Sequence, residues 1–436
     1  MERFRIGFFR VMKFFRVINS LLIGSLLLSA PTLVCAATLE HLIQLALESH
    51  PDAQTSRILQ DAAEQDVASA RWQFYPTVVG SVTGASTSSN DRSYLGDDYV
   101  ANVGIVQPLW TGGSLTSNLD SAKAGFKQSG AEIDQVEQEL ALRVLGIYVD
   151  WYSANLRVKS WQQSLKTHQG LSGQVQRRTL GGASSESDTA LAEARVAITE
   201  ADLAGAIAEE QAALAVLAQL VGKSLFSADL ADDYPQPVDL SADLSNLSLL
   251  AQDKNPIVMA ALAEVDVAQA RVGVVRAQYM PEVNLRLERQ NGNIGFADSS
   301  SSNRVFLEFT SRFGAGLSRR SDASAARLRR DAALASVESQ RQILASNIET
   351  DLALKKSIEQ RLVALAGAQR ATQAVYASFE RQFLSGSRTW LDLLNSAREL
   401  TQLELRIADV RASQVLVSWR LSILSRGLNS VLGDAP

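Results

Sequence analysis

The chain has 436 residues, of which 46% are hydrophobic and 20% charged, a balance typical of a folded protein. A formal net charge of −5 argues against a nucleic-acid-binding surface, so no nucleic acid is expected as a partner. Prolines are scarce, 9 in all, which favours long helices because proline interrupts a helix interior.

Residues 1–36 are predicted to be a secretory signal peptide. Basic residues precede the apolar run Val17–Ala30, and the small residue Ala36 suits a cleavage site. Met12 is an alternative start, and a membrane anchor is the alternative interpretation of this segment. Cleavage would remove Cys35, the only cysteine, so the exported chain would have neither disulfides nor thiolate metal ligands.

The rest of the chain contains an internal duplication. The segment RWQFYPTVVGSV, Arg71–Val82, aligns with RAQYMPEVNLRL, Arg276–Leu287, and the same shift aligns Pro51 with Pro256. No gap is needed between the matched prolines. The period is too long for a solenoid, so the sequence predicts a two-fold repeat.

Both copies are expected to have the element order αββαα. In the first copy, 37–222, we expect a helix at 38–75, strands at 77–86 and 99–109, and a helical hairpin at 115–178 and 186–222. In the second copy, 244–430, we expect a helix at 244–280, strands at 282–290 and 304–313, and helices at 317–382 and 389–430. A linker, 223–243, separates the copies, and a short tail, 431–436, follows.

The strands alternate apolar and polar residues. Val283, Leu285 and Leu287 alternate with charged or amide side chains, which predicts a sheet with one apolar face. Each run of about nine to eleven residues is long enough for a tilted strand to cross a bilayer. Aromatic residues stand where strands meet helices, as in the interfacial belts of membrane barrels: Phe74, Tyr75, Trp110, Tyr279 and Phe313. A half-buried soluble sheet with ordinary core aromatics is the alternative.

Four strands cannot close a barrel, and an open sheet edge would leave unpaired backbone groups in hydrocarbon. If these strands span a membrane, several chains must therefore share one barrel. The smallest transmembrane barrels have about eight strands, so at least two chains are needed, and three would supply twelve.

The helical hairpins are unusually long. Residues 115–178 would form a helix of about 96 Å at 1.5 Å per residue, with apolar residues at the spacing of a coiled-coil seam. Gly181–Gly182 and Ser385–Gly386 are expected to end the long helices and turn the chain back.

No catalytic set is found in the sequence. No two of His41, His50 and His168 stand at metal-ligand spacing and no nucleotide-binding loop is present, so neither an enzyme nor a cofactor is expected. The polar residues at the two turns remain as candidates: Glu186, Ser187 and Asp188 in the first, and Arg388, Asp392 and Asn395 in the second. Ordinary helix capping explains the same residue types.

The whole pattern resembles the TolC family of outer-membrane channel proteins. The resemblance is carried by the duplication and by four stretches of sequence: FYPTV, YMPEV, VQPLWTGGSL before the first long helix, and FLSGSRTWLDLLNSARELTQLELRIADVRAS at the second turn. The resemblance implies an α+β membrane protein that forms a homotrimer. Four strands per chain would build a 12-stranded outer-membrane β-barrel, and long antiparallel helices would build a periplasmic α-helical barrel.

The resemblance also implies roles for the turn residues. Asp392 matches a position that can place a carboxylate ring at the closed periplasmic entrance, and Arg388, Asp188 and Ser187 match positions whose polar links keep it closed. Asn395 stands where a second acidic residue can occur, and Phe383 where a hydrogen-bonding tyrosine can occur. Adaptor contacts are implied at the hairpin tips: Gly181, Gly182, Ser385 and Gly386.

The function expected from this resemblance is that of a passive exit duct in a tripartite export system. It would work with a periplasmic adaptor and an inner-membrane ABC transporter or proton-driven pump, in the outer membrane of a Gram-negative bacterium. The stretch GAGLSRRSDA, Gly314–Ala323, slightly favours protein or adhesin secretion over drug efflux. The alternative is a periplasmic coiled-coil adaptor or scaffold without a pore of its own.

Overall fold

The computed structural model describes residues 37–84, 97–230, 251, 254–293, 301–311 and 318–433. The predicted signal peptide, 1–36, and Phe313 lie outside the described residues, as does most of the linker at 223–243.

Long helices and one small antiparallel sheet make up the described chain, which confirms the expected α+β class. The first copy contains α1 (Leu39–Ser49), α2 (Pro51–Trp72), β1 (Thr77–Gly84), β2 (Tyr99–Trp110), α3 (Ser114–Leu180) and α4 (Glu186–Val221). A 3-10 turn, η1, lies at Ser227–Asp229 in the linker. The second contains α6 (Pro256–Ala277), β3 (Glu282–Asn291), β4 (Ser302–Thr310), α7 (Ser318–Leu384), α8 (Trp390–Arg426) and α9 (Leu428–Leu432).

The two copies agree in element length and in local chemistry. Helices α2 and α6 both have 22 residues and begin with a proline, and α3 and α7 both have 67 residues. The side chains of His50 and Asn255 cap α2 and α6 by accepting a hydrogen bond from a backbone N–H in the first turn.

Three predicted helices are broken in the structure. The helix expected at 38–75 is divided into α1 and α2 at His50, whose extended backbone (ψ 134°) suits the residue before a proline. The helix expected at 389–430 ends at Gly427, where φ is +82°, and α9 follows. Pro256 likewise begins α6 after extended Asn255, within the helix expected at 244–280.

The sheet has the order β1-β2-β3-β4, and every neighbouring pair is antiparallel. Its register aligns Val78 with Ile105, Ile105 with Leu287, and Leu287 with Val305, so apolar residues of all four strands share one face. Leu307 on this apolar face is 71% exposed. The opposite face carries the Arg286–Glu308 ion pair at 2.9 Å.

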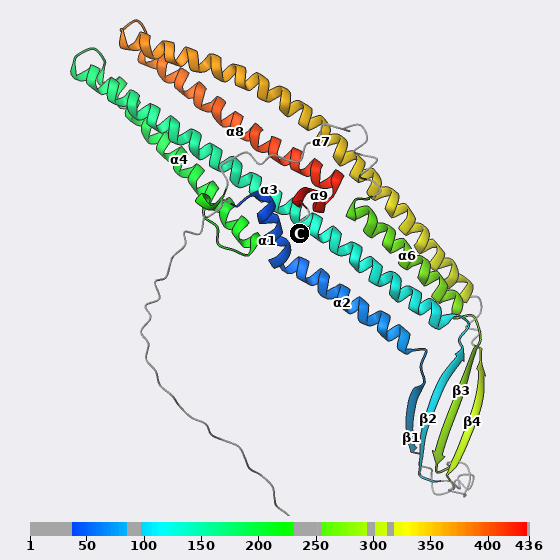
Figure 1. Cartoon of the computed structure of the whole chain (residues 1–436). Helices are drawn as coiled ribbons and strands as arrows, with labels where there is room; N and C mark the ends of the chain where they lie inside the picture. The colour runs from blue at the N-terminus through cyan, green and yellow to red at the C-terminus, as the bar shows by residue number, and fades with distance from the viewer. Residues whose placement is uncertain are drawn as a thin grey trace, which may run out of the picture. The chain divides into compact units, whose positions relative to one another are not determined.

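Helix α3 packs against helices of both repeats. It packs against α2 and α6 toward the sheet and against α4 and α8 toward the opposite end, while α7 packs against α6 and α8 (Figure 1). At 1.5 Å per residue, α3 and α7 are each about 100 Å long. The described helices therefore form two long antiparallel hairpins whose turns lie at the end away from the strands (Figure 1).

Three apolar clusters stabilise this arrangement. The largest joins α1 to α3, α4 and α8 around Tyr148, Trp151 and Trp419. A second joins α6, α7 and α8, and a third lies near the turns around Leu171, Phe383 and Trp390. The third cluster positions the polar residues that the sequence singled out.

By length and composition alone, one described helix, α4, could cross a membrane; 22% of its apolar window is buried. This is weak support for a span, because α4 also packs along α3.

Candidate functional site

Both hairpin turns use the same backbone geometry. Gly182 and Gly386 have φ values of +72° and +79°, a conformation that disfavours side chains with a Cβ atom. The N–H groups of Ala183 and Ser387 then donate to the carbonyls of Arg178 and Gln382, five residues earlier. This is the glycine-dependent Schellman ending of a helix, so the glycines are explained by the turns themselves.

Each turn leads into a capped helix. The Asp188 N–H donates to Ser185 Oγ at 3.2 Å while the Ser185 N–H donates to Asp188 Oδ2 at 3.1 Å, a reciprocal capping box. In the second turn the Asp392 N–H donates to Thr389 Oγ1 at 3.2 Å, and the Thr389 hydroxyl donates to Asp392 Oδ2 at 2.8 Å. The capping interpretation thus holds for both aspartates.

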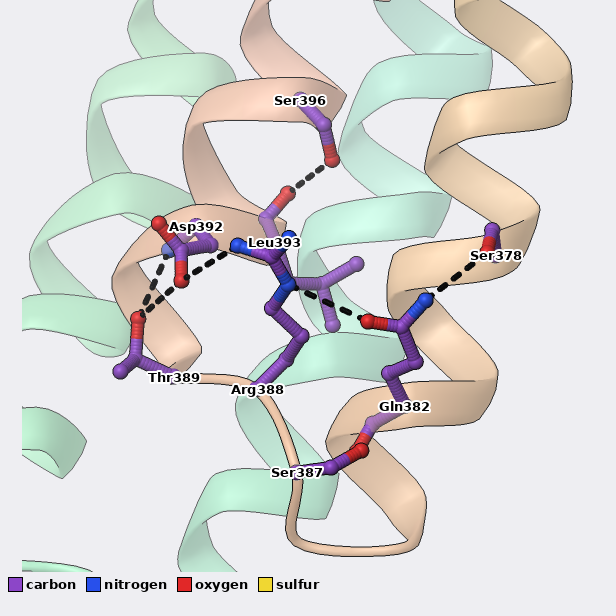
Figure 2. A network of polar contacts seen from close by, with 8 residues as sticks. All are labelled: Ser378, Gln382, Ser387, Arg388, Thr389, Asp392, Leu393 and Ser396. Atoms are coloured by element: carbon purple, nitrogen blue, oxygen red, sulfur yellow. Dashed lines mark hydrogen bonds and ion pairs between the residues drawn. The ribbon is translucent and has the colours of Figure 1, made fainter.

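Arg388 connects the two sides of the second turn (Figure 2). Its Nε donates to Gln382 Oε1 at 3.1 Å, its Nη1 lies 3.6 Å from Asp392 Oδ2, and its guanidinium lies 4.5 Å from the centre of the Phe379 ring. The hydrogen bond from Thr389, followed by the charge of Arg388, lowers the pKa of Asp392 below its usual value. Asp392 is therefore ionised at neutral pH.

At the turns, a contact between the two hairpins comes from a residue that the sequence analysis did not select. The Nη1 of Arg178, near the end of α3, donates to the backbone carbonyl of Phe383 at the end of α7. Its guanidinium also lies 4.6 Å from the centre of the Phe383 ring, which packs 6.1 Å from the Trp390 ring. Phe383 is buried, so in place of a polar contact it offers an apolar ring and a cation–π partner.

The structure does not gather all the predicted gate residues at one point. The hydrogen bonds and ion pair of Arg388 stay within its own hairpin among the described residues, and those of Asp188 stay at the start of α4. Ser187 is exposed at the start of α4. Asn395 lies on a separate recess.

That recess has a volume of about 150 Å³ and lies between α3, α4 and α8. Ser164, His168, Thr199 and Thr401 on its walls are buried, and Thr401 donates to Ser164 Oγ at 2.9 Å. Asn395, Arg195, Asp202 and Arg398 also line it. His168 Nδ1 is buried without a hydrogen-bond partner among the described residues. Burial, and secondarily Arg195, lowers the pKa of His168.

Of the predicted aromatic residues, Phe74, Tyr75, Trp110 and Tyr279 are in the described part of the chain and lie at the helix–strand junctions. Phe74, Tyr75 and Trp110 are 40%, 57% and 50% exposed. Trp72, which the sequence analysis missed, packs against Tyr75 with ring centroids 5.1 Å apart. Tyr279 donates its hydroxyl hydrogen to the Arg319 carbonyl, linking α7 to the start of β3.

In the described part of the chain, no group of three or more His, Cys, Asp or Glu side chains is arranged to hold a metal ion.

A family model described as "Outer membrane efflux protein" matches residues 42–223 and 247–423. The chain is 23% identical over 408 residues to the probable efflux pump outer membrane protein TtgC of Pseudomonas putida, covering 90% of this chain and 81% of the relative. It is 30% identical over 295 residues to Protein CyaE of Bordetella pertussis, covering 64% and 60%.

A third relative is the alkaline protease secretion protein AprF of Pseudomonas aeruginosa, 29% identical over 256 residues that cover 55% of this chain and 53% of AprF. Among solved structures, CusC superposes with a TM-score of 0.76 at 18% identity, over 88% of this chain and 91% of that chain. At this identity the likeness concerns the fold.

Proposed function

The chain belongs to the outer membrane efflux protein family, and from this premise we propose that it is the exit duct of a tripartite export system. The family is one of outer-membrane transport proteins, and the fold is that of its channels. The duct itself is passive, and its periplasmic entrance is gated at the two hairpin turns.

The observation that carries this proposal is the four-stranded sheet. Its apolar face is exposed, and its edge strands β1 and β4 pair on one side only within the described residues. Such a sheet suits hydrocarbon only when copies join edge to edge and close a barrel. Three copies supply twelve strands, so we propose a homotrimer whose apolar face contacts outer-membrane lipid.

The junction aromatics support this placement. In the trimer, Phe74, Tyr75, Trp110 and Tyr279 would lie at the periplasmic membrane interface, where amphipathic rings are favoured. Trp72 joins the same belt because its ring is 70% exposed beside Tyr75. The long helices then extend from this belt into the periplasm.

Exposed apolar side chains on the outer helices support assembly along the tunnel as well. They include Leu191, Ile198 and Val216 on α4 and Leu328, Ile343 and Val363 on α7. A second copy packed against these faces would remove them from water. The same packing accounts for the apolar composition of α4 without a membrane span.

We propose that the entrance is formed by the two turns. Three copies of ionised Asp392 would form a carboxylate ring that attracts cations. Arg388 and Asp188, with Ser187 beside it, would hold the turns in their closed geometry, and Phe383 would anchor them to the apolar cluster. Asn395 contributes to the neighbouring recess and adds no charge. The exposed tips at Gly181, Gly182, Ser385 and Gly386 would contact the adaptor.

Energy for export would come from the partners, a periplasmic adaptor and an inner-membrane ABC transporter or proton-driven pump. We favour a polypeptide cargo, supported by the stretch Gly314–Ala323 and by the relative named for alkaline protease secretion. A small-molecule cargo is the second candidate, because another relative is named as an efflux pump component.

The test is fractionation of cells that express the full chain. An SDS-resistant oligomer in the outer-membrane fraction that dissociates on heating supports the duct. A soluble periplasmic monomer overturns it in favour of a scaffold. Deleting candidate ABC transporter or proton-pump genes then separates the two cargo classes. Loss of a secreted protein supports a polypeptide cargo, and drug sensitivity alone supports a small-molecule cargo.

A further inference from the structure

The start of α7 is strongly basic. The segment Ser318–Arg330 contains Arg319, Arg320, Arg327, Arg329 and Arg330 but only one acid, Asp322. The positive end of the helix dipole lies at this terminus, so cations there are disfavoured unless an anion is nearby.

The duplication provides an internal comparison. The equivalent residues at the start of α3 are Leu115, Thr116, Lys123, Gly125 and Phe126, of which one is basic. The two helices have the same length and the same place in their repeats, so the arginines are not required by the fold of this element.

Contacts place this basic segment at the level of the proposed membrane interface. The Arg319 guanidinium lies 5.5 Å from the centre of the Tyr279 ring, and the backbone carbonyl of Arg319 accepts the hydrogen of the Tyr279 hydroxyl. Side chains on a helix tilt toward its N-terminus, which here is the end nearest the sheet (Figure 1). Arginines up to three turns along α7 therefore reach back toward the bilayer.

Two of the five arginines have partners. Arg319 packs on Tyr279, and Arg330 bonds to Asp331 and Gln269. The other three, Arg320, Arg327 and Arg329, are exposed and have no hydrogen bond or ion pair among the described residues. At about 100° per residue, Arg320 and Arg327 lie on one side of α7, two turns apart, and we name these two the arginine patch; Arg329 lies on the opposite side. Two unpaired guanidinium groups on one helix face beside a headgroup layer are suited to phosphodiester oxygens.

We propose that the arginine patch binds anionic phospholipid headgroups of the periplasmic leaflet, an inference that rests on the proposed placement of the sheet in the outer membrane. Each subunit of the trimer would then carry one patch, next to the aromatic belt. The lipid would be a specific partner at the point where barrel and helices meet.

The test uses the purified full-length oligomer exchanged into detergent with equal amounts of phosphatidylglycerol and phosphatidylcholine. Native mass spectrometry counts the bound lipids. The wild type should retain phosphatidylglycerol preferentially, and the Arg320→Gln/Arg327→Gln variant should lose about tenfold or more of that preference. The matched control is Arg370→Gln/Arg381→Gln, which removes two exposed arginines from one side of the same helix, farther from the sheet. This control should keep the preference.

An unchanged preference in the patch variant overturns the inference. A second outcome also overturns the inference: the patch variant dissociates in part, and the oligomer that remains keeps its lipid preference. The patch would then join copies of the chain instead of binding lipid. Displacement of the lipid by inorganic phosphate alone would show a general anion site and also overturn it. If the wild type is not recovered from outer membranes at all, the exit-duct proposal fails; a membrane-embedded wild type without lipid preference refutes only the lipid inference.

Discussion

Asp392 occupies in α8 the position that Asp188 occupies in α4. Each is the third residue after its N-cap, and each donates its backbone N–H to the cap hydroxyl at 3.2 Å. Only Asp392 also has an arginine beside it, Arg388 at 3.6 Å. The two aspartates therefore share one structural role and differ in their surroundings.

Because Asp188 and Asp392 have equivalent capping positions, the proposed gate role of Asp392 can be tested separately from its capping role. Asp392→Asn should reduce the cation selectivity of the duct, because it removes the charge of the proposed ring. Asp188→Asn removes the same charge from an equivalent cap and should alter selectivity much less. Reversal potentials in a salt gradient measure both variants. Equal effects would assign Asp392 to capping alone.

Arg178 is expected to hold the two hairpins together. Arg178→Ala removes the bond to the Phe383 carbonyl and the cation–π contact, and a desolvated contact of the latter kind contributes about 1–2 kcal/mol. Hydrogen exchange should therefore rise in residues 383–386. Arg177→Ala, a change at the exposed neighbouring arginine, is the control. Similar exchange in both variants would refute a specific role for Arg178.

The pH dependence of the tip region should follow His168. Its folded pKa lies below the usual 6.5, chiefly because of burial, so the unfolded chain binds the proton more readily. The contribution of neutral His168 to the free energy of unfolding is therefore fully present above pH 6.5. It is lost as the pH falls from 6.5 through the folded pKa. Arg195 opposes protonation of His168. Arg398 and Asp202 are the other charged residues that line the recess.

Proteolysis of the tip helices at pH 7.5 and 5.5 measures this effect. The wild type should be cleaved faster at the lower pH, and His168→Gln should show a smaller difference between the two conditions. His41→Gln, at an exposed histidine in α1, should behave like the wild type. A His168→Gln profile equal to that of the wild type would exclude His168 as the cause.

An ion pair between a buried carboxylate and a partly exposed arginine joins α7 to α8 in the second hairpin. Asp351 is 1% exposed and accepts from Arg420 Nε at 2.6 Å and from a second guanidinium nitrogen. Asp351→Asn removes the charge that Arg420 binds, and because the guanidinium is partly solvated the change should cost about 2 kcal/mol of stability. Replacing both by apolar residues, as in Asp351→Leu/Arg420→Met, should restore part of the loss. Thermal unfolding midpoints distinguish these outcomes, and an unchanged Asp351→Asn midpoint would contradict the assignment.

Much of the fold could be predicted because the repeat and the helical periodicity are long-range signals. The break at His50 was missed because proline is tolerated at the first position of a new helix, so the apolar periodicity continues across it. The burial of His168 could have been inferred, since it shares helical spacing with buried Leu171 and Val175.

Other features of the site gave no local signal. Arg178 binds a backbone carbonyl in the other repeat, and nothing in its own segment distinguishes it from Arg177. The partners of Arg388 depend on the geometry of the turn, which places Gln382 and Phe379 beside it. Sequence spacing alone could not separate these contacts from a bond to Asp188.

Single-channel recording in planar bilayers tests the exit duct and its gate most directly. The purified wild-type oligomer should give discrete conductance steps, and Arg388→Ser should give larger ones, because it removes the bond to Gln382 and the pair with Asp392 that hold the second turn. Steps of equal size would remove Arg388 from the gate. The absence of steps in both proteins would contradict the duct itself.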